Sequence, residues 1–139
     1  MNKRWADPLL LSLVGTAHAV EARLEAVVSP LGLSLAKVGI LARLAEAGEP
    51  VPLHELAERE RCVRSNITQL IDRLEHDGLV RRRADPIDRR SVRAVLTPEG
   101  ERLYAEAVEA LAREERDITS PLHSMDAANM LATLKLLAR

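Results

Sequence analysis

Six arginines stand within the short stretch from Arg81 to Arg93, and residues 59–93 hold ten in all. The same segment has six acidic residues, so its net charge is +4, whereas residues 1–58 carry −2 and residues 94–139 carry −3. A guanidinium group binds phosphate oxygens through paired hydrogen bonds. The overall charge of −1 conceals this segregation, which indicates a phosphate-facing surface in the middle third of the chain.

A set of uncharged polar residues lies just before these arginines, on a segment with helical periodicity. Apolar residues recur through residues 64–77 within one narrow sector at about 100° per residue, namely Ile67, Leu70, Ile71 and Leu74. The remaining surface carries mostly amides and hydroxyls: Ser65, Asn66, Thr68, Gln69, Asp72, Arg73 and His76. A helix that needs only solubility usually carries long charged residues there, so this face is predicted to contact a partner.

The elements around these residues follow from their flanking signals. Gly78 ends the helix, a short strand follows, and the arginine-rich loop turns back into a second strand at Ser91–Leu96. Thr97 and Pro98 then predict the start of another helix. A helix, a strand, a basic tip and a second strand form the arrangement with which a winged helix grips DNA. DNA binding is therefore the leading hypothesis.

Start and stop signals divide the rest of the chain into further helices. Asp7 and Pro8 start the first helix, and Ser124 is predicted to cap the last. The expected helical segments are 7–29, 34–48, 53–59, 64–77, 98–117 and 125–138, with an extended segment at 50–52. The predicted fold class is mainly α with a small β-wing.

The 139 residues are predicted to form a single domain, 1–139. Residues 34–96 form its winged helix-turn-helix DNA-binding core, and residues 7–29 and 97–138 flank that core. These outer segments carry more apolar surface than a small winged helix can cover. We therefore expect them to be dimerisation helices of a homodimer.

Several classes of protein are disfavoured. Cys62 is the only cysteine, which excludes an intramolecular disulfide and favours a reducing, cytoplasmic location. No signal-peptide pattern and no run of about 18 apolar residues is present, so no membrane partner is expected. No nucleophile–base set, phosphate loop or metal-type histidine spacing occurs, so we expect no catalysis, cofactor or metal. The absence of Phe argues against single-strand binding by base stacking.

Five motifs resemble, in their order and spacing, the MarR family of transcriptional regulators. They span about 45 residues and comprise Glu55–Ala57, Asn66–Leu74, Asp77–Val80, Asp85–Arg90 and Val95–Gly100. The resemblance implies a winged helix-turn-helix homodimer that dimerises through its terminal helices and binds a palindromic operator in double-stranded DNA. Such proteins usually act as repressors and often release DNA when a small anionic or phenolic inducer binds.

The resemblance places the helix from Arg64 in the major groove. The amides of Asn66 and Gln69 can pair bidentately with adenine. The hydroxyls of Ser65 and Thr68 suit bases or phosphates, whereas the guanidinium groups of Arg64 and Arg73 suit guanine or phosphate.

The resemblance also assigns roles in the wing. Asp88 is expected to orient the guanidinium of Arg90 by a charge-assisted pair, and Arg90 to enter a narrow minor groove. Arg82, Arg89 and Arg93 are expected to contact phosphates.

Two local features leave alternatives open. Val63 stands where the family usually has a capping Ser, and a lost cap costs about 1 kcal/mol. Ser65 would then cap a helix that begins two residues later. Cys62 in the preceding turn is either a redox switch or a small buried apolar residue.

The alternative function is a winged helix used for non-specific DNA binding or for protein contact.

Overall fold

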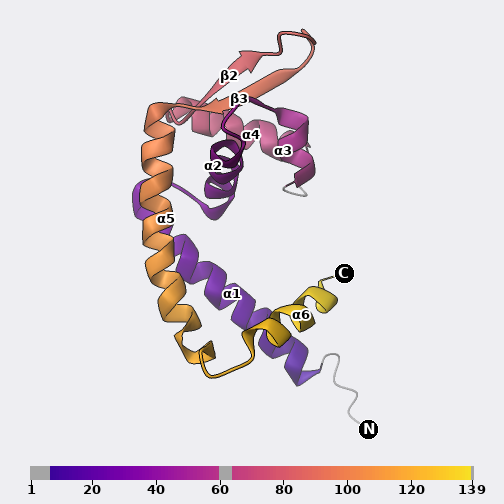
Figure 1. The fold of residues 1–139 in the computed structure, drawn as a ribbon, viewed down its shortest axis with the longest axis vertical. Helices are drawn as coiled ribbons and strands as arrows, with labels where there is room; N and C mark the ends of the chain where they lie inside the picture. Colours follow the sequence, from indigo (N-terminus) through magenta and orange to yellow (C-terminus); the bar gives the residue numbers. More distant parts are fainter. Residues whose placement is uncertain (1–6, 60–63, 139) are drawn as a thin grey trace.

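The computed structural model describes residues 7–59 and 64–138, which are mainly helical with one small antiparallel sheet (Figure 1). Helices α2 (Leu35–Ala47), α3 (Leu53–Arg59) and α4 (Arg64–His76) gather with the sheet at one end of the molecule. This lobe is the predicted winged helix.

Two long helices form an arm that leaves the lobe. Helix α1 (Pro8–Val28) packs along α5 (Pro98–Thr119), and α6 (Ala127–Leu137) follows α5 at the end of the arm away from the lobe (Figure 1). Short 3₁₀ turns follow α1 at Ser29–Leu31 and α5 at Ser120–Leu122, and each begins with a Ser-Pro pair, which disfavours continuation of the helix.

The sheet has the strand order β1-β3-β2, with β1 at Val51–Pro52, β2 at Val80–Ala84 and β3 at Val92–Leu96. Strands β2 and β3 form the wing and pair antiparallel, so Arg82 lies opposite Ala94 and Arg83 lies opposite Arg93. This confirms the strands predicted on both sides of the basic tip, and the extended segment at 50–52.

Side-chain caps explain where three of the helices begin. The carboxylate of Asp7 accepts the backbone N–H of Leu9 at 2.7 Å, and the hydroxyl of Ser34 accepts that of Lys37 at 3.2 Å. Thr97 accepts the N–H of Gly100 at 3.0 Å in the same way. All three caps were predicted from residue type.

The start of the last helix was predicted wrongly. Helix α6 begins at Ala127, and its cap is Asp126, whose carboxylate accepts the N–H of Asn129 at 3.0 Å. Ser124 lies two residues before that cap. Helix α5 also continues to Thr119, beyond the expected end near Asp117.

The core lies where the helices of the lobe meet the sheet. Its largest fully buried side chains on α2, α3 and α4 are Ile40, Leu41, Leu56, Ile67, Ile71 and Leu74, of which the last three belong to the predicted apolar sector of α4. Three of these come from α4, so burial of one face fixes which face of that helix is left outside.

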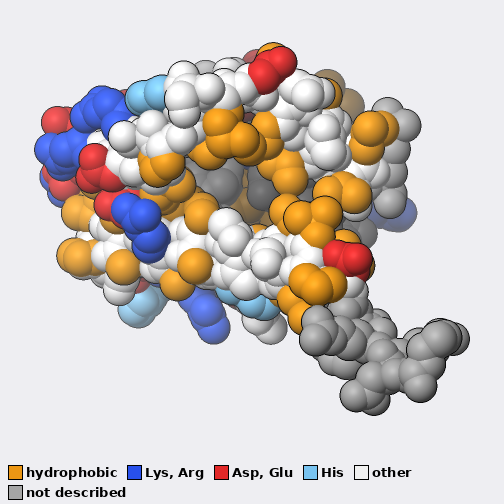
Figure 2. Space-filling model, turned by 90° about the horizontal axis from the view of Figure 1, so that it is seen from below, with side chains coloured by type: hydrophobic (Ala, Val, Ile, Leu, Met, Phe, Trp, Pro, Cys, Tyr) orange, Lys and Arg blue, Asp and Glu red, His pale blue; other side chains and the backbone are white. Residues whose placement is uncertain are grey.

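The arm leaves much apolar surface exposed. Large hydrophobic side chains are exposed at the start of α1 and along α6: Leu9, Leu10, Leu11, Val14, Leu131, Leu134, Leu136 and Leu137. Figure 2 views the molecule from this end and shows hydrophobic side chains gathered there.

Among the described residues, no single helix is long and apolar enough to cross a membrane. The segments Pro8–Leu31 and Leu35–Ala47 have the length and composition of a span only when taken together, and the chain bends by 74° between them.

Candidate nucleic-acid interface

Helix α4 presents the predicted polar face to solvent. Asn66, Thr68, Gln69 and Arg73 are exposed, whereas Ile67 and Ile71 on the other side are fully buried. Burial of the apolar side therefore holds the amides in a fixed orientation on a regular helix. Such a face is suited to hydrogen bonds with base edges in the major groove.

Part of the predicted set lies at the edge of the described structure. Helix α4 begins at Arg64, which is the earlier of the two predicted starts and places Ser65 in the first turn. The side chains of Arg64 and Ser65, and the whole of Cys62 and Val63, lie outside the described residues. The redox and buried interpretations of Cys62 both stay predictions.

Arg82 has partners inside the protein. Its guanidinium donates to the carboxylate of Glu75 at 2.8 Å and to that of Asp72, and its backbone N–H donates to Glu75 at 2.8 Å. The backbone N–H of Arg82, followed by its guanidinium, holds the pKa of Glu75 below its ordinary value. The sequence predicted a phosphate contact here, whereas the observed contacts join strand β2 to helix α4.

Arg93 is also held within the wing. Its Nε donates to the buried carboxylate of Asp85 at 2.7 Å, and one of its terminal nitrogens donates to the carbonyl of Pro50 at 3.4 Å. Asp85 also accepts the backbone N–H groups of Ile87 at 2.8 Å and Asp88 at 3.2 Å. One carboxylate thus joins strand β3 to the tip of the wing.

Asp88 shapes the tip by a contact that differs from the predicted one. Its carboxylate accepts the backbone N–H of Arg90 at 2.9 Å, whereas the sequence predicted a pair with the Arg90 guanidinium. The short Asp side chain reaches the backbone two residues ahead, as Asx turns do. Arg89 and Arg90 have exposed side chains at this tip.

Two exposed arginines belong to the predicted phosphate-facing segment but were assigned no individual contact from the sequence. Arg81 and Arg83 flank Arg82 on β2, and strand alternation turns them to the opposite face, where both are exposed. The period of two was visible in the sequence and could have separated them from Arg82. The wing therefore presents four exposed arginine side chains, those of Arg81, Arg83, Arg89 and Arg90.

The contacts of Asp85 predict a pH dependence of stability. The N–H of Ile87, then Arg93, then the N–H of Asp88 lower the pKa of Asp85 from 3.8 to about 2. A lowered folded-state pKa contributes stability that is fully present above about pH 4 and is lost as the pH falls through about 2. In thermal melts from neutral pH down to pH 2, wild type should therefore exceed Asp85→Asn in stability, and the gap should close below about pH 4. A gap that stays constant would contradict these contacts.

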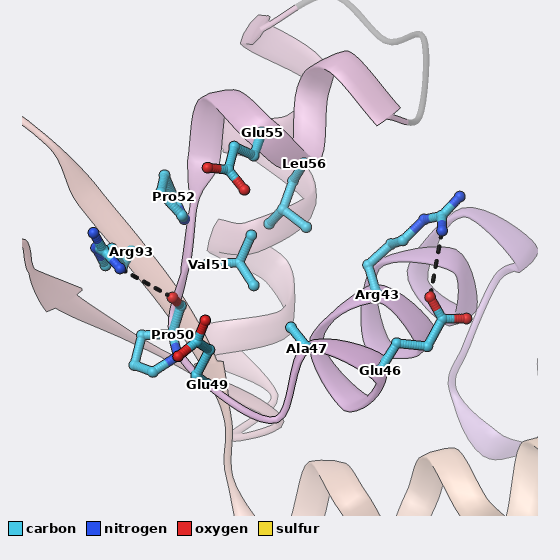
Figure 3. Close-up of a pocket in the computed structure, with 10 residues that line it drawn as sticks. All are labelled: Arg43, Glu46, Ala47, Glu49, Pro50, Val51, Pro52, Glu55, Leu56 and Arg93. Atoms are coloured by element: carbon cyan, nitrogen blue, oxygen red, sulfur yellow. Dashed lines mark hydrogen bonds and ion pairs between the residues drawn. The ribbon is translucent and has the colours of Figure 1, made fainter.

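A cleft of about 460 Å³ lies beside the wing, between the end of α2, β1 and α3 (Figure 3). Val51, Pro52 and Leu56 supply apolar lining, and Arg43 donates to Glu46 at 3.4 Å within it. Its three carboxylates, which belong to Glu46, Glu49 and Glu55, make it a poor site for an anion. Among the described residues, no group of three or more His, Cys, Asp or Glu is arranged to hold a metal ion.

Comparison with known protein families identifies relatives of this fold. A model of the MarR family matches residues 33–92, which run from the start of α2 to the first residue of β3. The HTH-type transcriptional regulator PecS from Dickeya dadantii is 33% identical over 132 residues, and the match covers 92% of this chain and 80% of PecS.

Solved structures give the same result. AbsC, a MarR family transcriptional regulator from Streptomyces coelicolor, superposes with a TM-score of 0.87 and is 25% identical, with 98% of this chain and 96% of AbsC covered. NadR, solved in complex with 4-hydroxyphenylacetate, has a TM-score of 0.71 and 27% identity, with 99% and 95% covered. PecS and AbsC are regulators of transcription and not enzymes, in agreement with the expectation from sequence.

Proposed function

Because the chain belongs to the MarR family of transcriptional regulators, we propose that it is a homodimer that binds a palindromic operator in double-stranded DNA and represses transcription. The observation that carries this proposal is the exposed polar face of α4 beside a wing with four exposed arginines. In each protomer, α4 enters the major groove and the wing tip reaches the adjacent minor groove. The proposed DNA binding agrees with the cytoplasmic location expected from the sequence.

The exposed apolar surface of the arm supports the homodimer. Leucines on α1 and α6 are exposed at 44–66% in the single chain. A patch of this kind on a monomer usually marks an interface, and a two-fold dimer would cover both helices with their counterparts. The dimer would then place two copies of α4 on half-sites about one helical turn apart.

A small organic molecule is the proposed inducer. The support is the similarity to NadR, whose structure holds 4-hydroxyphenylacetate. The acidic cleft of Figure 3 does not suit an anion of this kind, so we do not assign the inducer to it.

Gln69→Ala tests base recognition directly. The operator duplex for this test is the DNA that wild-type protein enriches from a random-sequence pool. If Gln69 pairs with a base, the variant should narrow the free-energy gap between operator and shuffled duplex by about 1–3 kcal/mol for each half-site. Because Gln69 is exposed, the melting temperature should not change. Binding is measured by fluorescence anisotropy.

Two other results would contradict base recognition by Gln69 or sequence-specific binding by the protein. Equal losses on both duplexes would make Gln69 a backbone contact. Weak wild-type binding that ignores sequence would favour the alternative function, a winged helix for non-specific DNA binding or protein contact.

A further inference from the structure

We infer that Arg82 is a positioning residue, which holds the wing against the recognition helix and offsets one of the two negative charges that Asp72 and Glu75 would otherwise present to DNA. The inference rests on the proposed DNA binding. It replaces the direct phosphate contact that the sequence predicted for this residue.

The first part of the argument is geometric. Arg82 lies on β2, and both carboxylates belong to α4, three residues apart at Asp72 and Glu75. Glu75 uses one oxygen for the Arg82 backbone N–H and the other for its guanidinium, both at 2.8 Å. A backbone bond and a side-chain bond to the same carboxylate restrict both the distance and the rotation of the strand relative to the helix.

The second part is electrostatic. The side chain of Asp72 is 59% exposed and that of Glu75 is 39% exposed, on the helix proposed to lie against phosphates. Two unpaired carboxylates there would repel a polyanion. The guanidinium of Arg82 bonds to both of them and is itself only 26% exposed. The positive charge of Arg82 is therefore paired with carboxylates of the protein itself.

The third part is the comparison with its neighbours. Arg81 and Arg83 lie on the other face of β2, have exposed side chains, and are available to phosphates. The three consecutive arginines therefore divide by strand alternation into two that face outward and one that faces the helix.

A double-mutant cycle distinguishes positioning by Arg82 from a direct contact of Arg82 with a phosphate. We expect Arg82→Gln to weaken binding to the operator duplex about tenfold in the wild-type background. In an Asp72→Asn/Glu75→Gln background, where the partner charges are absent, the same change should cost less than about twofold. In Glu75→Gln, the side-chain oxygen can still accept the backbone N–H at position 82. The triple variant can therefore be measured even if Arg82→Gln alone unfolds. A direct phosphate contact predicts an equal or larger loss in the second background, and that result would overturn the inference.

Hydrogen exchange in the free protein supplies a readout that does not depend on DNA. Arg82→Gln should speed exchange of the wing amides, while the amides of α5 remain as protected as in wild type. Unchanged protection of the wing would also overturn the inference. Suppose that Arg82→Gln speeds exchange of the wing amides but wild type binds no DNA from the random pool. The proposed function has then failed, and the role of Arg82 in DNA binding fails with it. If wild type binds DNA and the cycle shows no coupling, only the inference on Arg82 has failed.

Discussion

Arg90→Ala should weaken binding to the operator duplex by about 100-fold while leaving the fold unchanged. Arg90 has an exposed side chain at the tip, and the backbone of that tip is held by Asp88 and Asp85. Loss of one groove-reading arginine costs about 1–3 kcal/mol, and a dimer loses two. The backbone contacts that shape the tip do not involve the Arg90 side chain, so its removal should not distort the wing.

Anisotropy titrations and sedimentation of the same samples measure this effect. Arg113→Ala is the matched control, because Arg113 lies on α5, away from the proposed DNA interface, and among the described residues it pairs with Glu109 at 3.7 Å. The control should bind as wild type does, and both variants should keep the wild-type melting temperature and mass. Undiminished operator affinity of Arg90→Ala would remove the wing tip from the proposed mechanism.

Gly100→Ala should destabilise the fold by about 3 kcal/mol or more. Gly100 is buried at the start of α5, where the helix crosses the end of the preceding α4–β2 turn. A Cβ there would overlap the carbonyl oxygen of Leu79 and lie 3.2 Å from the Cδ2 of Leu96. The carbonyl of Leu79 also accepts the N–H of Thr97 at 3.1 Å, so the backbone cannot move away without losing that bond.

Gly15→Ala is a control for the effect of replacing a helical glycine by alanine where no steric clash occurs. Gly15 lies within α1, and a Cβ there would have open space within 4 Å. Gly15→Ala should raise the free energy of unfolding by about 0.5–1 kcal/mol. Denaturant unfolding of both variants at one protein concentration tests the pair. Similar stability of the two would show that α5 does not approach the Leu79 backbone as closely as described.

Much of the fold was predictable because its signals are local. A short polar side chain before an apolar periodic segment is a local signal for a helix cap, and Asp7, Ser34 and Thr97 all cap helices. Ser124 and Asp126 show the limit of this signal. Both residue types cap helices, they lie two positions apart, and only the backbone path after the 3₁₀ turn decides between them.

The candidate site was predicted less completely, since its side-chain partners depend on tertiary structure. Residue type and periodicity identified the polar face of α4 and the basic wing. The sequence alone did not reveal that Arg82 meets Asp72 and Glu75, because that contact depends on how β2 lies against α4. Arg93 and Asp85 pair across the wing for the same reason.

Selection from a random-sequence pool of DNA duplexes by the wild-type protein tests the central claim most directly, when followed by anisotropy over a salt series. We predict enrichment of an inverted repeat with half-sites about 10 base pairs apart. The enriched duplex should bind at least about 10³-fold more tightly than its shuffled counterpart, with an affinity that falls steeply as salt rises. Failure to enrich any sequence, or equal affinity for both duplexes, would contradict a sequence-specific dimeric regulator.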